Sequence, residues 1–497
     1  MKLKISFILL TVLIVINTAC KKLTDAGLPK NLLTAENTFG SDATAIAAIT
    51  NIYATISGMN TPVDPFKGIG LRAGLSADEL SFFNNYPSST SGYDDLLKYY
   101  QNSVTSFNAT PWVQLYSFVY NANVAINSLN STTSITPQVK QQLLGEMKFT
   151  RAFMYFYLVN LYGDVPLTLS ADYTVNQQIG RTPKTQVYQQ IVQDLIEAQS
   201  LMSDGYVDAT LLASTTERVR PNKWAATALL ARTYLYMGNY EQAELLATQV
   251  ISNNSLYRLP ALNEAFLKNS AETIWSTQPV GTLTQANTAE GRTFILTASG
   301  PTTGNPVYLS RQQMAAFTAG DLRGTVGNWI GSVTVAGTTY YYPTKYKIGS
   351  VSVATSEYSM MLRLGEQYLI RAEARARLGK VAAAAEDLNA LRTRARAAQT
   401  TAIPDPLPPI STSLSQTEIL SAVMQERQVE LFTEWGHRWL DLRRAGTIDA
   451  VMSVVTPLKV TTTSTPNTWN SAYALYPIPQ TEIDRSPLLK GQQNPGY

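Results

Sequence analysis

ARTYLYMGNYEQAELLA (residues 231–247) and AEARARLGKVAAAAEDL (residues 372–388) share one spacing of small and large residues. Four positions recur at intervals of 3, 9 and 4 residues, namely Ala231, Tyr234, Ala243 and Ala247 in the first copy and Ala372, Arg375, Ala384 and Leu388 in the second. Small residues at such positions let two paired helices approach closely, and a larger one fills the gap between pairs. The spacing therefore predicts tetratricopeptide-like helical hairpins.

Each copy also carries a turn signal at the same place. Gly238-Asn239 in the first copy and Gly379-Lys380 in the second separate the two predicted helices. The copies lie about 140 residues apart, and Arg375 stands in the second where the first has an aromatic residue. We therefore expect hairpins interrupted by insertions, and not a regular solenoid.

On either side of the repeats, apolar periodicity predicts further helices over 42–56 (with Asp42 as N-cap), 112–129, 137–162, 183–202 and 416–446. Residues 58–110 and 403–410 are predicted as loops. Residues 255–360 are predicted as a loop-rich, partly β insertion, with a hairpin at 331–342 that turns at Gly337. The predicted fold is mostly α, a single large domain (41–497) in which tetratricopeptide-like hairpins form a right-handed scaffold.

The N-terminus predicts the compartment. Lys2 and Lys4 precede an apolar run over 5–16, and Asn17-Thr18-Ala19 leads into Cys20. This order predicts a secretory signal peptide (1–19), and the run is too short to span a bilayer. Cys20 is the only cysteine, so we predict that it is the lipid-attachment site at the head of a tether over 20–40. The alternative is an ordinary signal peptide with an accidental cysteine, because Asn17 occupies a position where lipoproteins usually have Leu.

Composition excludes several classes of function. The formal charge is +3, and removal of Lys2 and Lys4 leaves the chain near +1, so no nucleic-acid partner is expected. No second long apolar run follows the signal, so the membrane is reached through the lipid anchor alone. Tyr outnumbers Phe by 27 to 14, and a tyrosine ring with its hydroxyl suits a hydrogen-bonding recognition surface.

The sequence offers few residues or motifs that are typical of an enzyme active site. His437 is the only histidine, and no serine-hydrolase, zinc or nucleotide-binding motif occurs. A glycosidase needs only two carboxylates, and Asp78-Glu79 in a loop-rich region could supply one. A salt-bridged or capping role for this pair is favoured. We predict no catalytic residue, no cofactor and no metal site.

Three stretches carry a family resemblance, namely RAFMYFYLVNLYGDVPL (151–167), ERQVELFTEWGHRWLDLRRAG (426–446) and YPIPQTEIDRSPLLKGQQNPGY (476–497). Together with the lipoprotein-like N-terminus and the two repeats, the chain resembles the SusD/RagB family of nutrient-binding lipoproteins. The resemblance implies a surface-exposed, lipid-anchored protein of the outer membrane. It also implies an oligosaccharide ligand, or a peptide in some members, that is delivered to a SusC-like TonB-dependent transporter.

The 426–446 stretch is rich in titratable residues. On one helix, the charged residues share a face opposite Phe432, Trp435, Trp439 and Leu442. We interpret the charges as an ion-pair lattice that ties the C-terminal helix to the repeats, formed by Glu426, Arg427, Glu430, Glu434, Arg438 and Asp441.

Sugar recognition needs flat rings for stacking and polar groups for hydroxyls. Two aromatic-rich regions supply both, one over 78–102 and one in the insertion, where Tyr340 and Tyr342 also lie. The candidate ligand-binding residues are Asp78, Phe83, Tyr86, Tyr93, Asn102, Tyr308, Arg311, Trp329 and Tyr341. Trp329, flanked by Gly327-Asn328 and Gly331, is expected to be an exposed platform, whereas core packing is the alternative for every aromatic.

The leading hypothesis is a glycan-binding lipoprotein. A peptide-binding member of the same family, an extracellular glycoside hydrolase and a scaffold that binds only the transporter are the alternatives.

Overall fold

The structure is a computed structural model that describes residues 35–57, 65–83, 91–108, 110–279, 287–350, 353–460 and 466–497. The predicted signal peptide, Cys20 and Tyr86 lie outside these residues, so their assignments stay predictions. Within the described ranges, no helix is long and apolar enough to cross a membrane.

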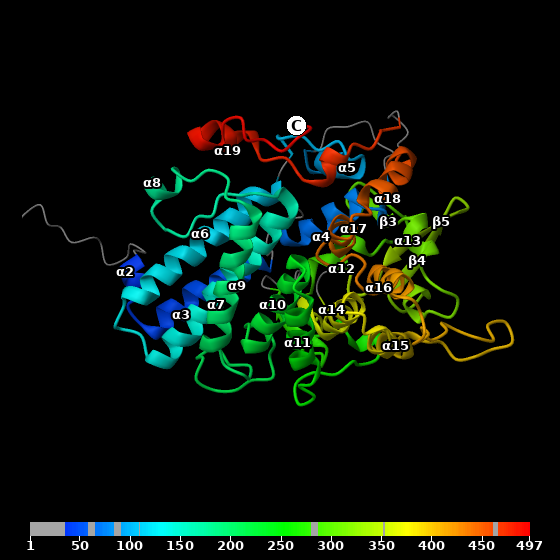
Figure 1. Ribbon diagram of the computed structural model, residues 1–497, viewed down its shortest axis with the longest axis horizontal. Coiled ribbons are helices and arrows are strands. Elements are labelled where there is room, and N and C mark those ends of the chain that lie inside the picture. Colours follow the sequence, from blue (N-terminus) through cyan, green and yellow to red (C-terminus); the bar gives the residue numbers. More distant parts are fainter. Residues whose placement is uncertain are drawn as a thin grey trace, which may run out of the picture.

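The core of the molecule is a row of helices in which each element packs on the next (Figure 1). The row consists of α6 (Thr110–Ser131), α7 (Pro137–Tyr162), α9 (Lys184–Leu201), α10 (Lys223–Met237), α11 (Tyr240–Ile251), α14 (Leu364–Arg377), α15 (Val381–Ala395) and α16 (Gln416–Glu430). α3 (Asp42–Ile56) packs across α6 and α7. The mostly helical prediction is confirmed, although Ser41 and not Asp42 caps α3.

The two sequence repeats are the hairpins α10–α11 and α14–α15, and they are neighbours in space. Gly238 and Gly379 both adopt the left-handed conformation at the predicted turns, with φ of 77° and 75°. The small residues of the repeats are fully buried, and α11 packs against α14. The long insertion between the copies therefore leaves the second hairpin stacked on the first.

Arg375, which replaces the aromatic of the first copy, forms ion pairs between the hairpins. Its Nε lies 3.2 Å from Glu244 of α11, and its Nη1 lies 2.9 Å from Asp387 of α15. Charge pairing here takes the place of ring packing, which explains why the second copy departs from the pattern.

The insertion, the chain ends and the connection between α7 and α9 supply the smaller elements. These helices are α2 (Ala35–Thr38), α4 (Pro65–Ser76), α5 (Ser91–Tyr100), α8 (Tyr173–Asn176), α12 (Ala289–Phe294), α13 (Arg311–Ala315), α17 (His437–Arg444), α18 (Ile448–Val455) and α19 (Gln480–Arg485). The strands form three antiparallel pairs: β1 (Leu80–Phe82) with β3 (Val307–Leu309), β2 (Thr273–Thr277) with β6 (Ser359–Arg363), and β4 (Ile330–Val335) with β5 (Thr338–Pro343). The predicted hairpin is β4–β5.

The loop prediction for 58–110 is wrong where α4 and α5 form. The glycines of α4 suggest a loop, but they serve close packing instead. A Cβ on Gly70 would lie 3.0 Å from the carbonyl oxygen of Thr433, so this helix can approach the 431–436 segment only without a side chain there.

The prediction of one helix over 416–446 is also wrong. α16 ends at Glu430 and α17 starts at His437, because Thr433, Trp435 and Gly436 take positive φ values of 60°, 50° and 72°. The indole Nε1 of Trp435 donates to the carbonyl of Met360 at 2.8 Å. The charged residues of this stretch therefore do not share one helix face.

Their role in an ion-pair lattice is nevertheless confirmed. Arg363 lies at the centre, with Nη1 2.7 Å from both Glu272 and Glu430 and Nε 2.7 Å from Glu434. The whole cluster, hereafter the ion cluster, contains five cations and five carboxylates: Arg323, Arg363, Arg392, Arg394, Lys345, Asp321, Glu272, Glu426, Glu430 and Glu434. Because its formal charges balance, the cluster can be buried as a unit.

The remaining signature residues tie other helices together. Arg427 joins Asp441 at 2.6 Å across the break between α16 and α17. Arg438 pairs with Asp78, and Arg444 pairs with both Glu373 of α14 and Asp441. The C-terminal signature thus connects to the second repeat, as predicted.

The ion cluster predicts a large effect for Arg363→Met. Removing this guanidinium leaves Glu272, Glu430 and Glu434 short of a buried partner, which costs about 3–5 kcal/mol of unfolding free energy. The matched control is Arg377→Met, because Arg377 is exposed in the adjoining helix; it should change stability by less than about 0.5 kcal/mol. Urea denaturation of both variants measures the difference. Equal stabilities would contradict a structural role for the cluster.

Candidate functional site

A short strand pairing joins the two regions that the sequence singled out. In β1 and β3, Ser81 lies opposite Tyr308, and Phe82 lies opposite Val307. The pairing continues one residue further, because the backbone N–H of Phe83 donates to the carbonyl of Pro306 at 2.7 Å. The end of the 78–102 region is thereby fixed beside the insertion.

Three aromatic side chains meet at this junction and form what we call the aromatic ridge: Phe83, Tyr308 and Tyr340. The rings of Tyr308 and Tyr340 lie 5.1 Å apart at an interplanar angle of 85°, and those of Phe83 and Tyr340 lie 6.2 Å apart at 88°. All three are partly exposed. Edge-to-face packing of this kind is favourable and orients the rings relative to one another.

Charge next to the ridge comes from Arg311, which is exposed at the start of α13. Burial raises the pKa of Tyr308 and the neighbouring Tyr340 adds to this, whereas the Arg311 guanidinium opposes it. Arg311 is therefore close enough to act on the ridge, and its side chain can donate to a ligand acceptor.

Tyr341 lies on the other face of its strand. Successive side chains of a strand point to opposite faces, so Tyr340 and Tyr341 diverge. Tyr341 is exposed at 36%, but it is not part of the ridge.

Three predicted ligand residues lie inside the protein, where protein groups already satisfy them. Both carboxylate oxygens of Asp78 accept from Arg438 at 2.7 Å. The hydroxyl of Tyr93 donates to the carbonyl of Phe83. The side chain of Asn102 donates to Ser76 and accepts from Lys459 at 3.1 Å. Of the three, Tyr93 holds the backbone of the ridge residue Phe83, whereas the polar groups of Asp78 and Asn102 are bound by other parts of the protein.

The expectation that Trp329 is an exposed platform is wrong. Trp329 is 0% exposed, and its Nε1 donates to the carbonyl of Leu262 at 2.9 Å. Lys345 Nζ lies 4.8 Å from its ring centroid, so the indole covers the ion cluster. The flanking glycines suggested a surface loop, but nothing in the local sequence reveals the buried charges that the ring packs against.

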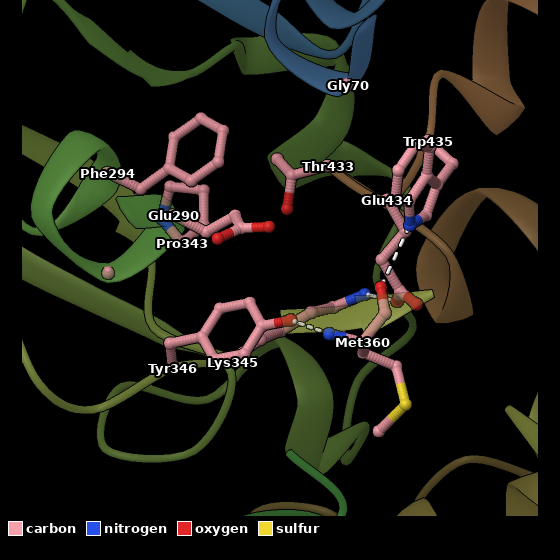
Figure 2. Close-up of a pocket in the computed structure, with 11 residues that line it drawn as sticks. Gly70, Glu290, Phe294, Pro343, Lys345, Tyr346, Met360, Thr433, Glu434 and Trp435 are labelled. Carbon is pink, nitrogen blue, oxygen red and sulfur yellow. Dashed lines mark hydrogen bonds and ion pairs between the residues drawn. The ribbon is translucent and has the colours of Figure 1, made fainter. Parts of the chain in front are cut away.

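A small cavity lies beside the ion cluster, lined by Glu290, Phe294, Lys345, Tyr346, Glu434 and others (Figure 2). Its volume is about 30 Å³, enough for roughly two water molecules and too small for a sugar ring. Burial lowers the pKa of Lys345 to about 8, against the attraction of Glu434. The cavity is part of the supporting core and not a ligand site.

Residues that could do chemistry are buried away from the ridge. Burial lowers the pKa of His437 well below its usual range, with Arg232 the next cause. Burial raises the pKa of Glu79 to about 8, although the backbone N–H of Thr433 donates to it at 2.5 Å. Among the described residues, no group of three or more His, Cys, Asp or Glu side chains could hold a metal ion.

Two family descriptions match the chain. The SusD family matches residues 274–497, and a family described as starch-binding associating with outer membrane matches residues 75–235. A SusD-like protein of Formosa agariphila is 26% identical over all of both chains. A second one from the same organism is 26% identical over 78% of this chain and 79% of its own length.

Solved structures share the fold. A SusD superfamily protein of Bacteroides vulgatus superposes with a TM-score of 0.72 at 19% identity, covering 92% of this chain and all of its own. A laminarin binding SusD-like protein superposes with a TM-score of 0.67 at 21% identity, covering 92% of this chain and 99% of its own. At such identities the likeness concerns the fold alone.

The buried carboxyl of Glu79 predicts a pH-dependent stability. The unfolded chain releases this proton at about pH 4.5 and the folded chain at about pH 8. The free energy of unfolding therefore falls as the pH rises between these two values. Glu79→Gln removes the titration, so its stability relative to the parent should rise by up to about 1.4 kcal/mol per pH unit over this window.

Urea denaturation of both proteins at about pH 5 and about pH 8 checks this difference. Lys345 also titrates near the upper end of this window, but both proteins contain it, so its contribution cancels in the comparison. Glu386→Gln, at an exposed carboxylate of α15, is the control and should show no pH-dependent difference. A parallel pH dependence of Glu79→Gln and the parent would overturn the assignment.

Proposed function

The chain belongs to the SusD/RagB family, and from that premise we propose that it binds an oligosaccharide at the cell surface and delivers it to a SusC-like TonB-dependent transporter. The observation that carries the proposal is the aromatic ridge, where Phe83, Tyr308 and Tyr340 from separate parts of the chain present ring surface next to Arg311.

Ring surface of this kind suits sugars because the C–H face of a pyranose stacks on an aromatic ring while its hydroxyls reach polar neighbours. The hydroxyls of Tyr308 and Tyr340 and the guanidinium of Arg311 supply such neighbours. The laminarin binding relative, a protein of the same fold, supports a glycan over a peptide ligand.

Binding without catalysis is the second part of the proposal. A glycosidase would need two carboxyl groups facing one sugar, with different protonation states. Asp78 has both oxygens bound by Arg438, and Glu79 is 1% exposed. Neither carboxyl lies at the ridge surface, so we do not favour a hydrolase.

The proposed location is the outer face of the outer membrane, with Cys20 carrying the acyl anchor. The family description that matches residues 75–235 names an association with this membrane and supports the location. A lipid on a short polar tether would hold the folded body beside its transporter without inserting it.

The ridge predicts a defined loss of affinity for Tyr340→Ala. Loss of the central ring removes stacking worth about 0.5–1.5 kcal/mol, so a bound neutral oligosaccharide such as laminarin fragments should bind about three- to tenfold more weakly. Tyr341→Ala is the matched control because it removes the same side chain from the opposite face. Isothermal titration calorimetry measures both.

Equal losses in the two variants would place the sugar elsewhere on the protein. Failure of the parent protein to bind any glycan in a broad panel, together with clear binding of peptides, would move the protein to the peptide-binding alternative.

The anchor predicts a second outcome. Cys20→Ala should yield a protein that carries no acyl groups, while the purified body keeps its glycan affinity. Mass spectrometry checks this. A variant with unchanged acyl mass would rule out Cys20 as the anchor.

A further inference from the structure

A second, larger hollow lies far along the chain from the ridge residues. It is lined by the C-terminal end of α7, the start of α9, the end of α10, α17 and the C-terminal tail. Its volume is about 1230 Å³, above the roughly 300–1,000 Å³ of common small-molecule sites. We call it the basic groove.

Positive charge predominates in the lining of the basic groove. Among the described residues that line it, four are cationic (Arg181, Lys184, Arg443 and Arg444) and one, Asp164, is a carboxylate. Two of the cations are occupied: Arg181 donates to carbonyls and to Asn494 of the tail, and Arg444 pairs with Glu373 and Asp441.

Lys184 and Arg443 have no carboxylate partner among the described residues. Arg443 is partly buried, and its one acceptor there is the backbone carbonyl of Asn160. Burial lowers the pKa of Arg443, and the neighbouring tyrosines Tyr188, Tyr476 and Tyr236 oppose this only in part. A partly desolvated guanidinium without a counter-charge is unusual in a folded protein, because burial of an unpaired charge is costly.

Two of the side-chain acceptors in the wall are already in use. The side-chain oxygen of Asn160 accepts from Tyr188 at 2.9 Å, and one oxygen of Asp164 accepts from the backbone of Lys184 at 2.8 Å. In contrast, the hydroxyl of Tyr236 and Nε of Arg444 are buried polar atoms without a hydrogen-bond partner among the described residues. The groove therefore has an excess of donors.

The N-terminal end of α9 adds to the positive potential. α9 is 18 residues long and starts at Lys184, so the positive end of its dipole lies at the groove. Asp164 offsets part of this effect, since it caps the first N–H.

We propose that the basic groove binds an acidic saccharide, whose carboxylate contacts Lys184 and Arg443 while a sugar ring lies against the tyrosines Tyr188 and Tyr236. The anion follows from the unpaired cations and the excess of donors. The choice of a saccharide rests on the proposed function and on the tyrosine rings in the wall, since an acidic protein segment would not require such rings.

Titration calorimetry with tetragalacturonate and with its fully methyl-esterified form tests the proposal, because the two differ in charge on one backbone. We expect the acid to bind at least about tenfold more tightly than the ester, with an affinity that falls as salt increases. Lys184→Glu, at an exposed site, should weaken binding of the acid by at least about tenfold. Arg443→Met should do the same if it folds.

Lys268→Glu is the control, since it makes the same charge change at an exposed lysine outside the groove and should leave binding unchanged. Equal binding of acid and ester, or unchanged binding in Lys184→Glu, would overturn the proposal. Binding of a poly-glutamate peptide with the same Lys184 dependence, without binding of tetragalacturonate, would also overturn it in favour of an acidic protein segment.

Tyr340→Ala separates this proposal from the proposed function. Under our account it leaves binding of tetragalacturonate at the groove intact. If the affinity for a neutral glycan is unchanged in Tyr340→Ala, only the proposed ridge site is contradicted. If the affinity for tetragalacturonate is unchanged in Lys184→Glu, only the proposed groove site is contradicted.

Discussion

Around Arg363, buried charges balance one another, and this balance holds three distant parts of the chain in one arrangement. Removing ten ionisable groups from water is costly, and the cost is met only where each group finds partners at short distance. The partners come from segments spread between Glu272 and Glu434, so the second repeat, the insertion and the C-terminal signature must all be in place together. We regard the cluster as a device for specifying one arrangement more than as a source of net stability.

The proposed ligand surface follows from this arrangement. The segment over 431–436 includes Glu434 of the ion cluster and packs on α4 at Gly70, and the backbone N–H of Thr433 donates to the carboxyl group of Glu79. Glu79 directly precedes β1, and β1 pairs with β3, so the aromatic ridge stands at the end of a chain of contacts that begins at buried charges. Phe83 and Tyr308 are more than 200 residues apart in sequence, yet a three-residue ladder fixes them side by side.

Much of the helical framework could be predicted from sequence because its signals are local. The turn glycines Gly238 and Gly379 and the first-turn Pro137 act within their own helices. Prediction from local sequence failed where the environment of a residue is set by partners distant in sequence. Trp329 looks like a loop residue beside glycines, but it covers the ion cluster. Asn102 looks like a polar loop residue, but it holds the buried ammonium of Lys459.

The two regions that form the candidate site could be predicted from the sequence, but the individual residues could not. The sequence indicated two aromatic regions, and the structure joins them, but the choice among individual rings depended on strand alternation and pairing. Tyr340 contacts both neighbours, whereas Tyr341, one residue further, points away. The basic groove was not predicted, because its residues come from five separated segments and each has an ordinary structural role when viewed alone.

A crystal of the folded body soaked with the tightest-binding neutral oligosaccharide from a glycan panel would locate the ligand on the protein. We expect difference density for a sugar ring in contact with Tyr340 and Tyr308, with a polar contact to Arg311. Sugar density on another face, with the ridge rings free, would contradict this expectation.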